Sequence, residues 1–175
     1  MHNPLVSVII PNYCHARYLD QRIQSVLNQT YQNFEVIILD DCSPDDGASR
    51  AVIEKYRDNP HVSHIVYNTE NSGSTFRQWN KGFGLAKGEL IWIAESDDYC
   101  EKDLMEKLIQ PFLYTKQCSI SFCRTVLVDE QGNMQSAGPP NLNSGIYDGG
   151  SFIREFMSIG NSIVNASSVL FSKEC

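Results

Sequence analysis

The sequence of 175 residues lacks several patterns, and each absence argues against a class of protein. It has no apolar run long enough to cross a bilayer and no signal-peptide pattern at its N-terminus. Basic residues are few, 14 against 21 acidic ones, and the net charge of −7 argues against a broad nucleic-acid surface. The six cysteines form no CxxC pair and no metal-ligand spacing. We therefore expect one soluble cytoplasmic domain with reduced thiols and no transmembrane segment.

Two kinds of phosphate-binding loop are also missing. A dinucleotide-binding domain needs a glycine-rich turn after its first strand, so that the backbone can approach a pyrophosphate. Here that turn, at residues 11–17, reads PNYCHAR and contains no glycine. No GxxxxGK[ST] sequence occurs either. Both absences disfavour a dinucleotide-binding Rossmann domain and a P-loop enzyme.

The sequence does contain a regular alternation of strand and helix patterns. Strands are predicted at residues 6–11, 36–39, 64–67 and 90–94, and helices at 18–29, 48–56, 75–86 and 102–114. This alternation indicates an α/β fold, with right-handed βαβ units on a doubly wound, mostly parallel sheet flanked by helices. Further along we expect strands at 119–122, 125–128 and 167–171, a short helix at 151–159, and a loop at 136–147.

The most informative stretch is ELIWIAESDDY, at residues 89–99. Its apolar first half is typical of a strand buried on both faces of a parallel sheet. The stretch ends in Glu95, Asp97 and Asp98, and two adjacent aspartates at the end of a buried strand repel each other. A cation would relieve this repulsion, and Mg²⁺ is held by one or two carboxylates, water and substrate phosphate. The alternative is that Asp97 or Asp98 caps the helix that follows.

Other notable side chains follow two more of the predicted strands. Tyr13 comes after the first strand, and Asp40 and Asp41 close the second. In parallel α/β sheets, ligands bind beyond the carboxyl ends of the strands. We therefore expect these side chains and the carboxylates at residues 95–98 to lie along one edge of the sheet.

Three segments resemble the family 2 glycosyltransferases: VSVIIPNY, SVLNQTYQNFEVIILDDCSPDD and NSGSTFRQWNKGFGLAKGELIWIAESDD. The resemblance runs from about residue 5 to residue 104 and keeps the order and spacing of the motifs. It implies the GT-A fold and transfer of a sugar from a nucleotide diphosphate sugar, with a UDP-sugar favoured. Transfer in this family usually proceeds with inversion and with Mn²⁺ or Mg²⁺. The implied acceptor is a glycan or a lipid-linked molecule, and the implied process is the synthesis of a polysaccharide or a cell-surface glycan. A lipid-linked acceptor would bring the protein to the inner face of the membrane.

The resemblance also implies roles for individual residues. Pro11 and Tyr13 lie where the family packs the nucleoside, with Tyr13 against the base. Asp41 matches the aspartate that reads a uracil-like base edge, which suits a carboxylate because it can accept a hydrogen bond from a ring N–H. Asp98 matches the metal ligand of the family's DxD motif, and Asp97 matches a residue near the ribose.

Two further residues belong to the implied nucleotide site. Gly73 fits the family's NxG turn, where a backbone without Cβ can lie close to the ligand. Arg77 could offset the charge of the diphosphate, or it could be a solvated helix residue. We expect Asp40 to position the loop beside Asp41.

The general base of an inverting transfer is not assigned. Such a base deprotonates the acceptor hydroxyl on the face opposite the leaving group, and by its spacing from the DxD motif we expect it beyond Cys175. Asp148 and Glu155 are the nearest carboxylates present, and we assign neither. We therefore expect residues 1–175 to be a single GT-A domain truncated at its C-terminus. Its donor-binding part would cover residues 5–115, and its acceptor-binding part would begin at residues 116–175.

Two other functions stay open. A sugar nucleotidyltransferase has a related sheet but needs a glycine-rich, basic loop after the first strand, and PNYCHAR matches that loop poorly. A nucleotide-sugar binding module without turnover is the second alternative, because the sequence offers no general base.

Overall fold

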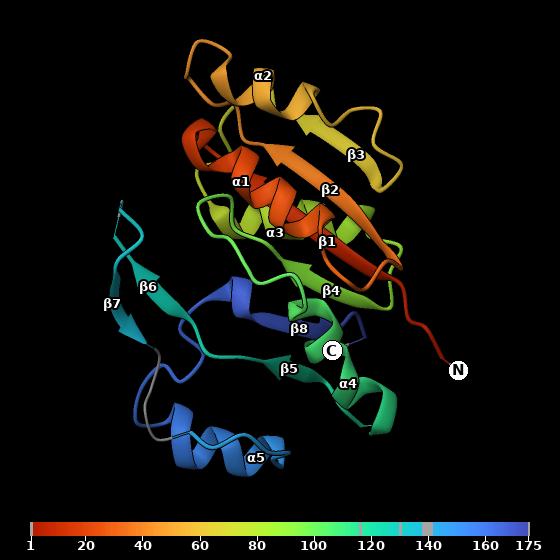
Figure 1. Cartoon of the computed structure of the whole chain (residues 1–175), viewed down its shortest axis with the longest axis vertical. Coiled ribbons are helices and arrows are strands. Elements are labelled where there is room, and N and C mark those ends of the chain that lie inside the picture. Colours follow the sequence, from red (N-terminus) through yellow and green to blue (C-terminus); the bar gives the residue numbers. More distant parts are fainter. Residues whose placement is uncertain (1, 116, 130, 138–141, 175) are drawn as a thin grey trace.

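The computed structural model describes residues 2–115, 117–129, 131–137 and 142–174. The strands are β1 (Val6–Asn12), β2 (Phe34–Asp40), β3 (Val62–Tyr67), β4 (Leu90–Ile93), β5 (Ile120–Phe122), β6 (Val126–Val128), β7 (Met134–Ala137) and β8 (Val169–Ser172). The helices are α1 (Ala16–Leu27), α2 (Ala48–Glu54), α3 (Thr75–Leu85), α4 (Leu104–Tyr114) and α5 (Gly149–Phe152), with a π-helix η1 (Ile153–Met157) and a 3₁₀ helix η2 (Ala166–Ser168). Figure 1 shows their arrangement.

One sheet organises the described residues, with strand order β3-β2-β1-β4-β8-β5. Strand β1 pairs in parallel with both β2 and β4, and β2 pairs in parallel with β3. Strand β8 runs antiparallel to both β4 and β5. The predicted α/β fold with a mostly parallel sheet is therefore confirmed.

Both faces of the sheet are covered by helices, which is why β1, β2 and β4 are buried along their whole length. One face packs against α1, α2 and α4, in a core that includes Val8, Ile10, Ile23 and Trp92. The other face packs against α3, and Ile9 belongs to that core. Figure 1 shows α1 in front of the sheet and α3 behind it. Alternate strand residues thus point into two separate cores.

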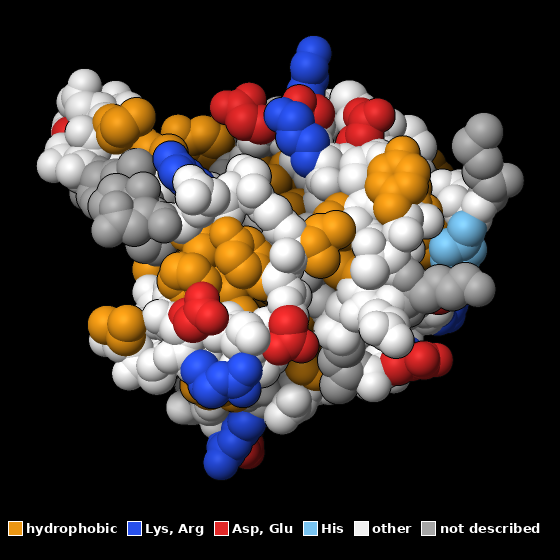
Figure 2. Space-filling model, turned by 90° about the horizontal axis from the view of Figure 1, so that it is seen from below, with side chains coloured by type: hydrophobic (Ala, Val, Ile, Leu, Met, Phe, Trp, Pro, Cys, Tyr) orange, Lys and Arg blue, Asp and Glu red, His pale blue; other side chains and the backbone are white. Residues whose placement is uncertain are grey.

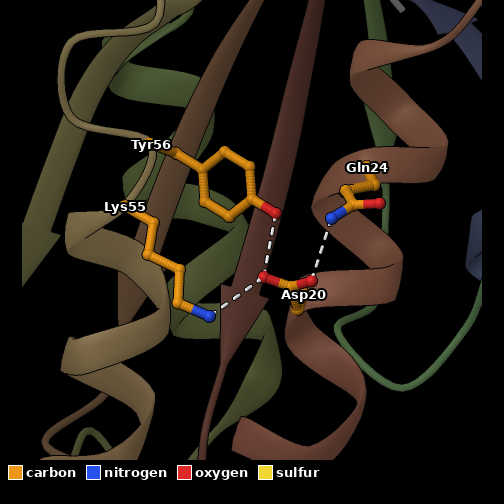
Figure 3. A network of polar contacts seen from close by, with 4 residues as sticks. All are labelled: Asp20, Gln24, Lys55 and Tyr56. Carbon is orange, nitrogen blue, oxygen red and sulfur yellow. Dashed lines mark hydrogen bonds and ion pairs between the residues drawn. The ribbon is translucent and has the colours of Figure 1, made fainter.

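A polar network also joins α1 to the end of α2 (Figure 3). The carboxylate of Asp20 accepts hydrogen bonds from Gln24 Nε2 at 3.0 Å and from Tyr56 Oη at 2.9 Å. Lys55 Nζ lies 3.4 Å from the same carboxylate. Because these side chains are at least partly exposed, we expect the network to add little to the stability of the fold.

The second part of the chain departs from the predicted elements at three places. Strand β7 was not predicted and enters the predicted loop at 136–147, of which residues 138–141 lie outside the described residues. The predicted helix at 151–159 begins earlier, because Asp148 accepts a hydrogen bond from Ser151 N at 2.9 Å, and it continues as a π-helix. The predicted strand at 167–171 begins only at Val169, since Asn165 Oδ1 accepts from Ser167 N and closes a turn.

Hydrophobic side chains are exposed mainly in this second part of the chain. Figure 2 looks onto the end of the molecule that carries α5 and β5 and shows such side chains gathered there. The most exposed of those after α4 are Met134, Ile146, Ile153 and Ile159. In contrast, most of the main core comes from residues 6–109. No helix of the described residues is long and apolar enough to cross a membrane.

Two glycines of α3 allow a test of how closely this helix packs against the sheet. A Cβ at Gly82 would lie 2.5 Å from Cγ2 of the fully buried Ile9, whereas a Cβ at Gly84 would meet nothing within 4 Å. We expect Gly82→Ala to lower the free energy of unfolding by about 1–3 kcal/mol through overpacking. The matched change Gly84→Ala should raise it by about 0.5–1 kcal/mol, because alanine favours the helix. Urea unfolding of both variants measures this, and equal effects would contradict the packing.

Candidate functional site

The carboxyl ends of β1, β2 and β4 border a cavity of about 270 Å³, to which the start of α3 also contributes. Four of the predicted site residues line it, namely Pro11, Tyr13, Asp41 and Gly73. Glu95 and Ser96, which follow β4, line it as well. The expectation that these strand ends meet at one edge is therefore confirmed.

The other three predicted site residues lie outside the wall of this cavity. Arg77 is exposed, and its Nη1 donates to the backbone oxygen of Ser72 at 2.5 Å. Asp97 is exposed, and Asp98 is partly buried with its Oδ2 accepting from Asn165 Nδ2 at 2.9 Å. Both aspartates directly follow Ser96, so they stand beside the cavity.

The structure overturns the helix-capping alternative for these two aspartates. Helix α4 begins at Leu104, and the residue at its N-cap is Asp103. Asp97 and Asp98 therefore precede the helix by more than one turn and cannot reach its first N–H groups.

Asp41 joins the loop after β2 to the segment before α3. The buried carboxylate accepts from Asn68 Nδ2, Ser72 N and Gln78 Nε2 on Oδ1, at 2.6, 2.9 and 2.8 Å. Its Oδ2 accepts from Ser72 Oγ at 2.7 Å. A carboxylate oxygen can accept more than one hydrogen bond, so Oδ2 keeps the capacity for another donor.

Asp40 fixes the neighbouring loop in the way the sequence predicts. Its Oδ1 accepts from Asn12 Nδ2 at 2.7 Å and from Ser43 Oγ at 2.7 Å. Ser43 Oγ in turn accepts from Cys14 N at 2.9 Å, which connects the loops after β1 and β2. The two adjacent aspartates therefore brace different loops.

The backbone is held in the left-handed region at three points around the cavity. Cys14 has φ 60°, Cys42 has φ 59° and Gly73 has φ 70°. Left-handed backbone costs a non-glycine residue energy and is found at sites where surrounding contacts impose it. The positive φ of Gly73 agrees with the predicted turn, since glycine adopts it without a steric cost.

Glu95 carries the most perturbed carboxyl group of the site. Burial, together with the negative charges of Asp97 and Asp98, raises the pKa of Glu95 to about 7, although Trp79 Nε1 donates to its Oε1 at 2.8 Å. Its backbone N donates to Ser167 Oγ at 2.9 Å. The segment at 95–98 therefore combines a negative field with a rigid frame.

Sequence reasoning did not assign four of the residues that build this frame. His15 Nδ1 lies 2.8 Å from Ser96 Oγ and joins the loops after β1 and β4. Trp79 supports Glu95 from α3, and Asn165 and Ser167 support Asp98 and Glu95 from the turn before β8. The helical pattern around Trp79 was visible in the sequence, but no pattern linked residues 165–167 to the acidic segment.

The carboxylates beside the cavity fit a hard divalent cation. Within the described ranges, no group of three or more His, Cys, Asp or Glu side chains is arranged as a metal cage. Mg²⁺ does not need such a cage, because one or two carboxylates suffice when water and substrate phosphate complete its shell. Burial is the main cause of the raised pKa of Glu95, and the negative charges of Asp97 and Asp98, which a cation would neutralise, add to it. Asp97 and Asp98 are therefore the residues that could hold one.

The comparisons with known proteins agree with this geometry. The family model for glycosyl transferase family 2 matches residues 7–164. The chain is 36% identical over 129 residues to the teichuronic acid biosynthesis glycosyltransferase TuaG of Bacillus subtilis, covering 74% of this chain and 50% of TuaG. It is 33% identical over 135 residues to a chondroitin synthase of Escherichia coli, covering 77% of this chain and 19% of that protein.

A solved structure shows the same fold. The crystal structure of S. aureus TarS 1-349 in complex with UDP superimposes with a TM-score of 0.57 at 29% identity, covering 66% of this chain and 33% of TarS. The described sheet with its flanking helices thus matches a GT-A fold. This chain spans half or less of the length of each of these proteins.

The raised pKa of Glu95 makes a prediction about stability and pH. The folded protein holds this proton up to about pH 7, whereas the unfolded chain releases it near 4.5, so stability should fall as pH rises through this window. We expect Glu95→Gln to flatten this part of the profile, measured as the melting temperature between pH 4.5 and 8. The exposed Glu70→Gln is the control and should keep the wild-type profile. Identical profiles for all three proteins would contradict the assignment.

Proposed function

The chain belongs to glycosyl transferase family 2, and from that premise we propose that it is the donor-binding part of a polysaccharide-building glycosyltransferase. The reaction is transfer of a sugar from a nucleotide diphosphate sugar, with inversion, to a glycan or a lipid-linked acceptor. The carrying observation is that Tyr13, Asp41 and Gly73 meet around one cavity, with Asp97 and Asp98 beside it. The polysaccharide role is supported by the names of the relatives, TuaG and chondroitin synthase.

We propose a uracil-containing donor. Tyr13 is 44% exposed at the cavity wall, so its ring is free to stack on a base. Asp41 Oδ2 accepts one hydrogen bond and could accept a second from the N–H of a uracil ring. The TarS neighbour, solved in complex with UDP, supports this choice of base.

The diphosphate needs a cation in this site. Among the described residues, those that line the cavity include the acids Asp41 and Glu95 but no lysine or arginine. Arg77, which the sequence left open as a diphosphate contact or a solvated helix residue, is exposed and donates to the Ser72 carbonyl. We propose that Mn²⁺ or Mg²⁺ supplies the charge, held by Asp98, with Asp97 near the ribose. When bound, such an ion stabilises the leaving diphosphate.

The residues of the chain then have separate tasks. Tyr13 and Asp41 orient the nucleoside, Gly73 lets the backbone approach it, and Asp98 anchors the ion. Neither Asp148 nor Glu155 is proposed as the general base, because Asp148 caps α5 and Glu155 lies exposed on η1. The base and the acceptor site are proposed to belong to the acceptor-binding part.

A binding screen tests the donor class directly. The melting temperature of the chain would be measured with UDP, GDP, ADP and CDP, each with Mn²⁺ and with EDTA. The proposal expects the largest rise with UDP and Mn²⁺ together, because bound ligand stabilises the folded state. Equal responses to all four nucleotides would contradict recognition of uracil, and release of UDP from a UDP-sugar would separate turnover from binding alone.

Replacement of Tyr13 tests the stacking. We expect Tyr13→Ala to weaken UDP binding by about 1–3 kcal/mol, the usual range for a base on an aromatic ring, and to leave pyrophosphate binding unchanged. Calorimetric titration of both ligands measures this. The control is Tyr114→Ala, since Tyr114 is 82% exposed at the end of α4 and does not line the cavity. Equal losses for UDP and pyrophosphate would place Tyr13 away from the base.

Replacement of Asp98 tests the metal site. We expect Asp98→Asn to abolish the gain in UDP affinity that Mn²⁺ provides, while affinity in EDTA stays as in the wild type. The matched control is Asp58→Asn, an exposed aspartate beyond α2. A variant that keeps the full gain from Mn²⁺ would show that Asp98 is not the ligand.

A further inference from the structure

Arg22 of α1 is a fully buried basic residue beneath the site. Its Nε donates to the backbone oxygen of Glu95 at 2.9 Å, and its guanidinium lies 5.2 Å from the ring centre of Trp92 on β4. Neither Nη1 nor Nη2 has a hydrogen-bond partner among the described residues. The side chain therefore connects α1 to the start of the carboxylate turn, which we define as residues 95–98.

A buried guanidinium needs compensation, because transfer of a charge out of water costs several kcal/mol. Burial lowers the pKa of Arg22, and the nearby groups Cys100, Asp98 and Glu95 act against that shift. Two of these three groups are carboxyls of the carboxylate turn. The buried guanidinium, bonded to the Glu95 carbonyl, therefore lies next to a turn of opposite charge.

The geometry points to Arg22 as a built-in counter-cation of the carboxylate turn, which positions Asp98 when no divalent ion is bound. Asn165 supports Asp98 from the other side with a neutral N–H donor. Arg22 contributes the charge, and its bond to the Glu95 carbonyl fixes where that charge lies. Arg22 is thus a positioning residue, since it acts through Asp98 and not on the substrate.

This role gives Arg22 two effects of opposite sign. Without a divalent ion, the guanidinium offsets the repulsion among the carboxylates and stabilises the fold. With an ion bound to Asp98, the same positive charge repels it and weakens its binding. If Arg22 only filled space, its replacement would change the stability of the ion-free fold and the affinity for the ion in the same direction.

The first experiment compares two adjacent aspartates in EDTA, where the proposed metal function plays no part. Asp98→Asn removes a carboxylate that acts on Arg22, and Asp97→Asn removes an exposed one from the same turn. We expect Asp98→Asn to lower the melting temperature by roughly 2–4 °C and Asp97→Asn to leave it unchanged or raise it. The loss should persist in an Asn165→Ala background, which removes the neutral donor. Equal effects of the two changes, or a loss that vanishes in that background, would overturn the proposal.

The second experiment varies Arg22 itself and rests on the proposed function. The melting temperature of Arg22→Met should be lower than that of wild type in EDTA, yet it should rise by more than that of wild type when Mn²⁺ and UDP are added. Arg22→Lys keeps the charge, so its melting temperature should rise on addition of Mn²⁺ and UDP by as much as that of wild type. A smaller rise for Arg22→Met than for wild type would overturn the counter-cation role. If wild type itself shows no response to Mn²⁺ and UDP, the proposed function fails, whereas the comparison of aspartates still decides the role of Arg22. That comparison also decides it if Arg22→Met does not fold.

Discussion

The parallel pairing of β1 with both β2 and β4 is the constraint on which the site depends. Val6 is in register with Phe34 of β2 and with Leu90 of β4, so the three strands begin at the same height. Strands β1 and β2 also end level, whereas β4 ends at Ile93, opposite Ile9, and the chain after it continues along the same edge. All three are buried on both faces, and apart from the hydrogen-bonded pair Ser7–Glu35 near their starts, polar side chains collect where the strands end. The cavity is therefore a consequence of how the core is built, as is usual for open α/β sheets.

The loops at this edge are held chiefly by carboxylates. Asp40 braces the loops after β1 and β2, and Asp41 braces the segment that leads into α3. Each carboxylate serves several donors at once, so a single side chain can fix backbone that lacks secondary structure. This arrangement also explains how Cys14 and Cys42 remain in the left-handed region, since the bonded loops offer them no relaxed alternative.

Much of the donor-binding part could be predicted from the sequence, because its signals are local. Continuous apolar runs marked β1, β2 and β4, helical spacing marked α1, and the parallel topology then placed Tyr13, Asp41 and Glu95 at one edge. Prediction was weaker after α4, where strands are short and side chains are exposed. The start of β8 and the π-helical η1 depend on side-chain bonds and backbone adjustments that periodicity does not report.

Arg22 and Asn165 show why the frame of the site escaped prediction. Arg22 lies on a helix whose apolar face includes Leu19 and Ile23, and a basic residue at the edge of such a face is normally solvated. In the folded protein it lies beneath the turn after β4 and against the ring of Trp92, and these are tertiary contacts that local sequence does not report. Asn165 reaches Asp98 across 67 positions of sequence. A strand that is followed by adjacent carboxylates requires positive charge or hydrogen-bond donors from elsewhere in the chain. The sequence therefore predicts that such partners exist, but only the tertiary structure identifies them as Arg22 and Asn165.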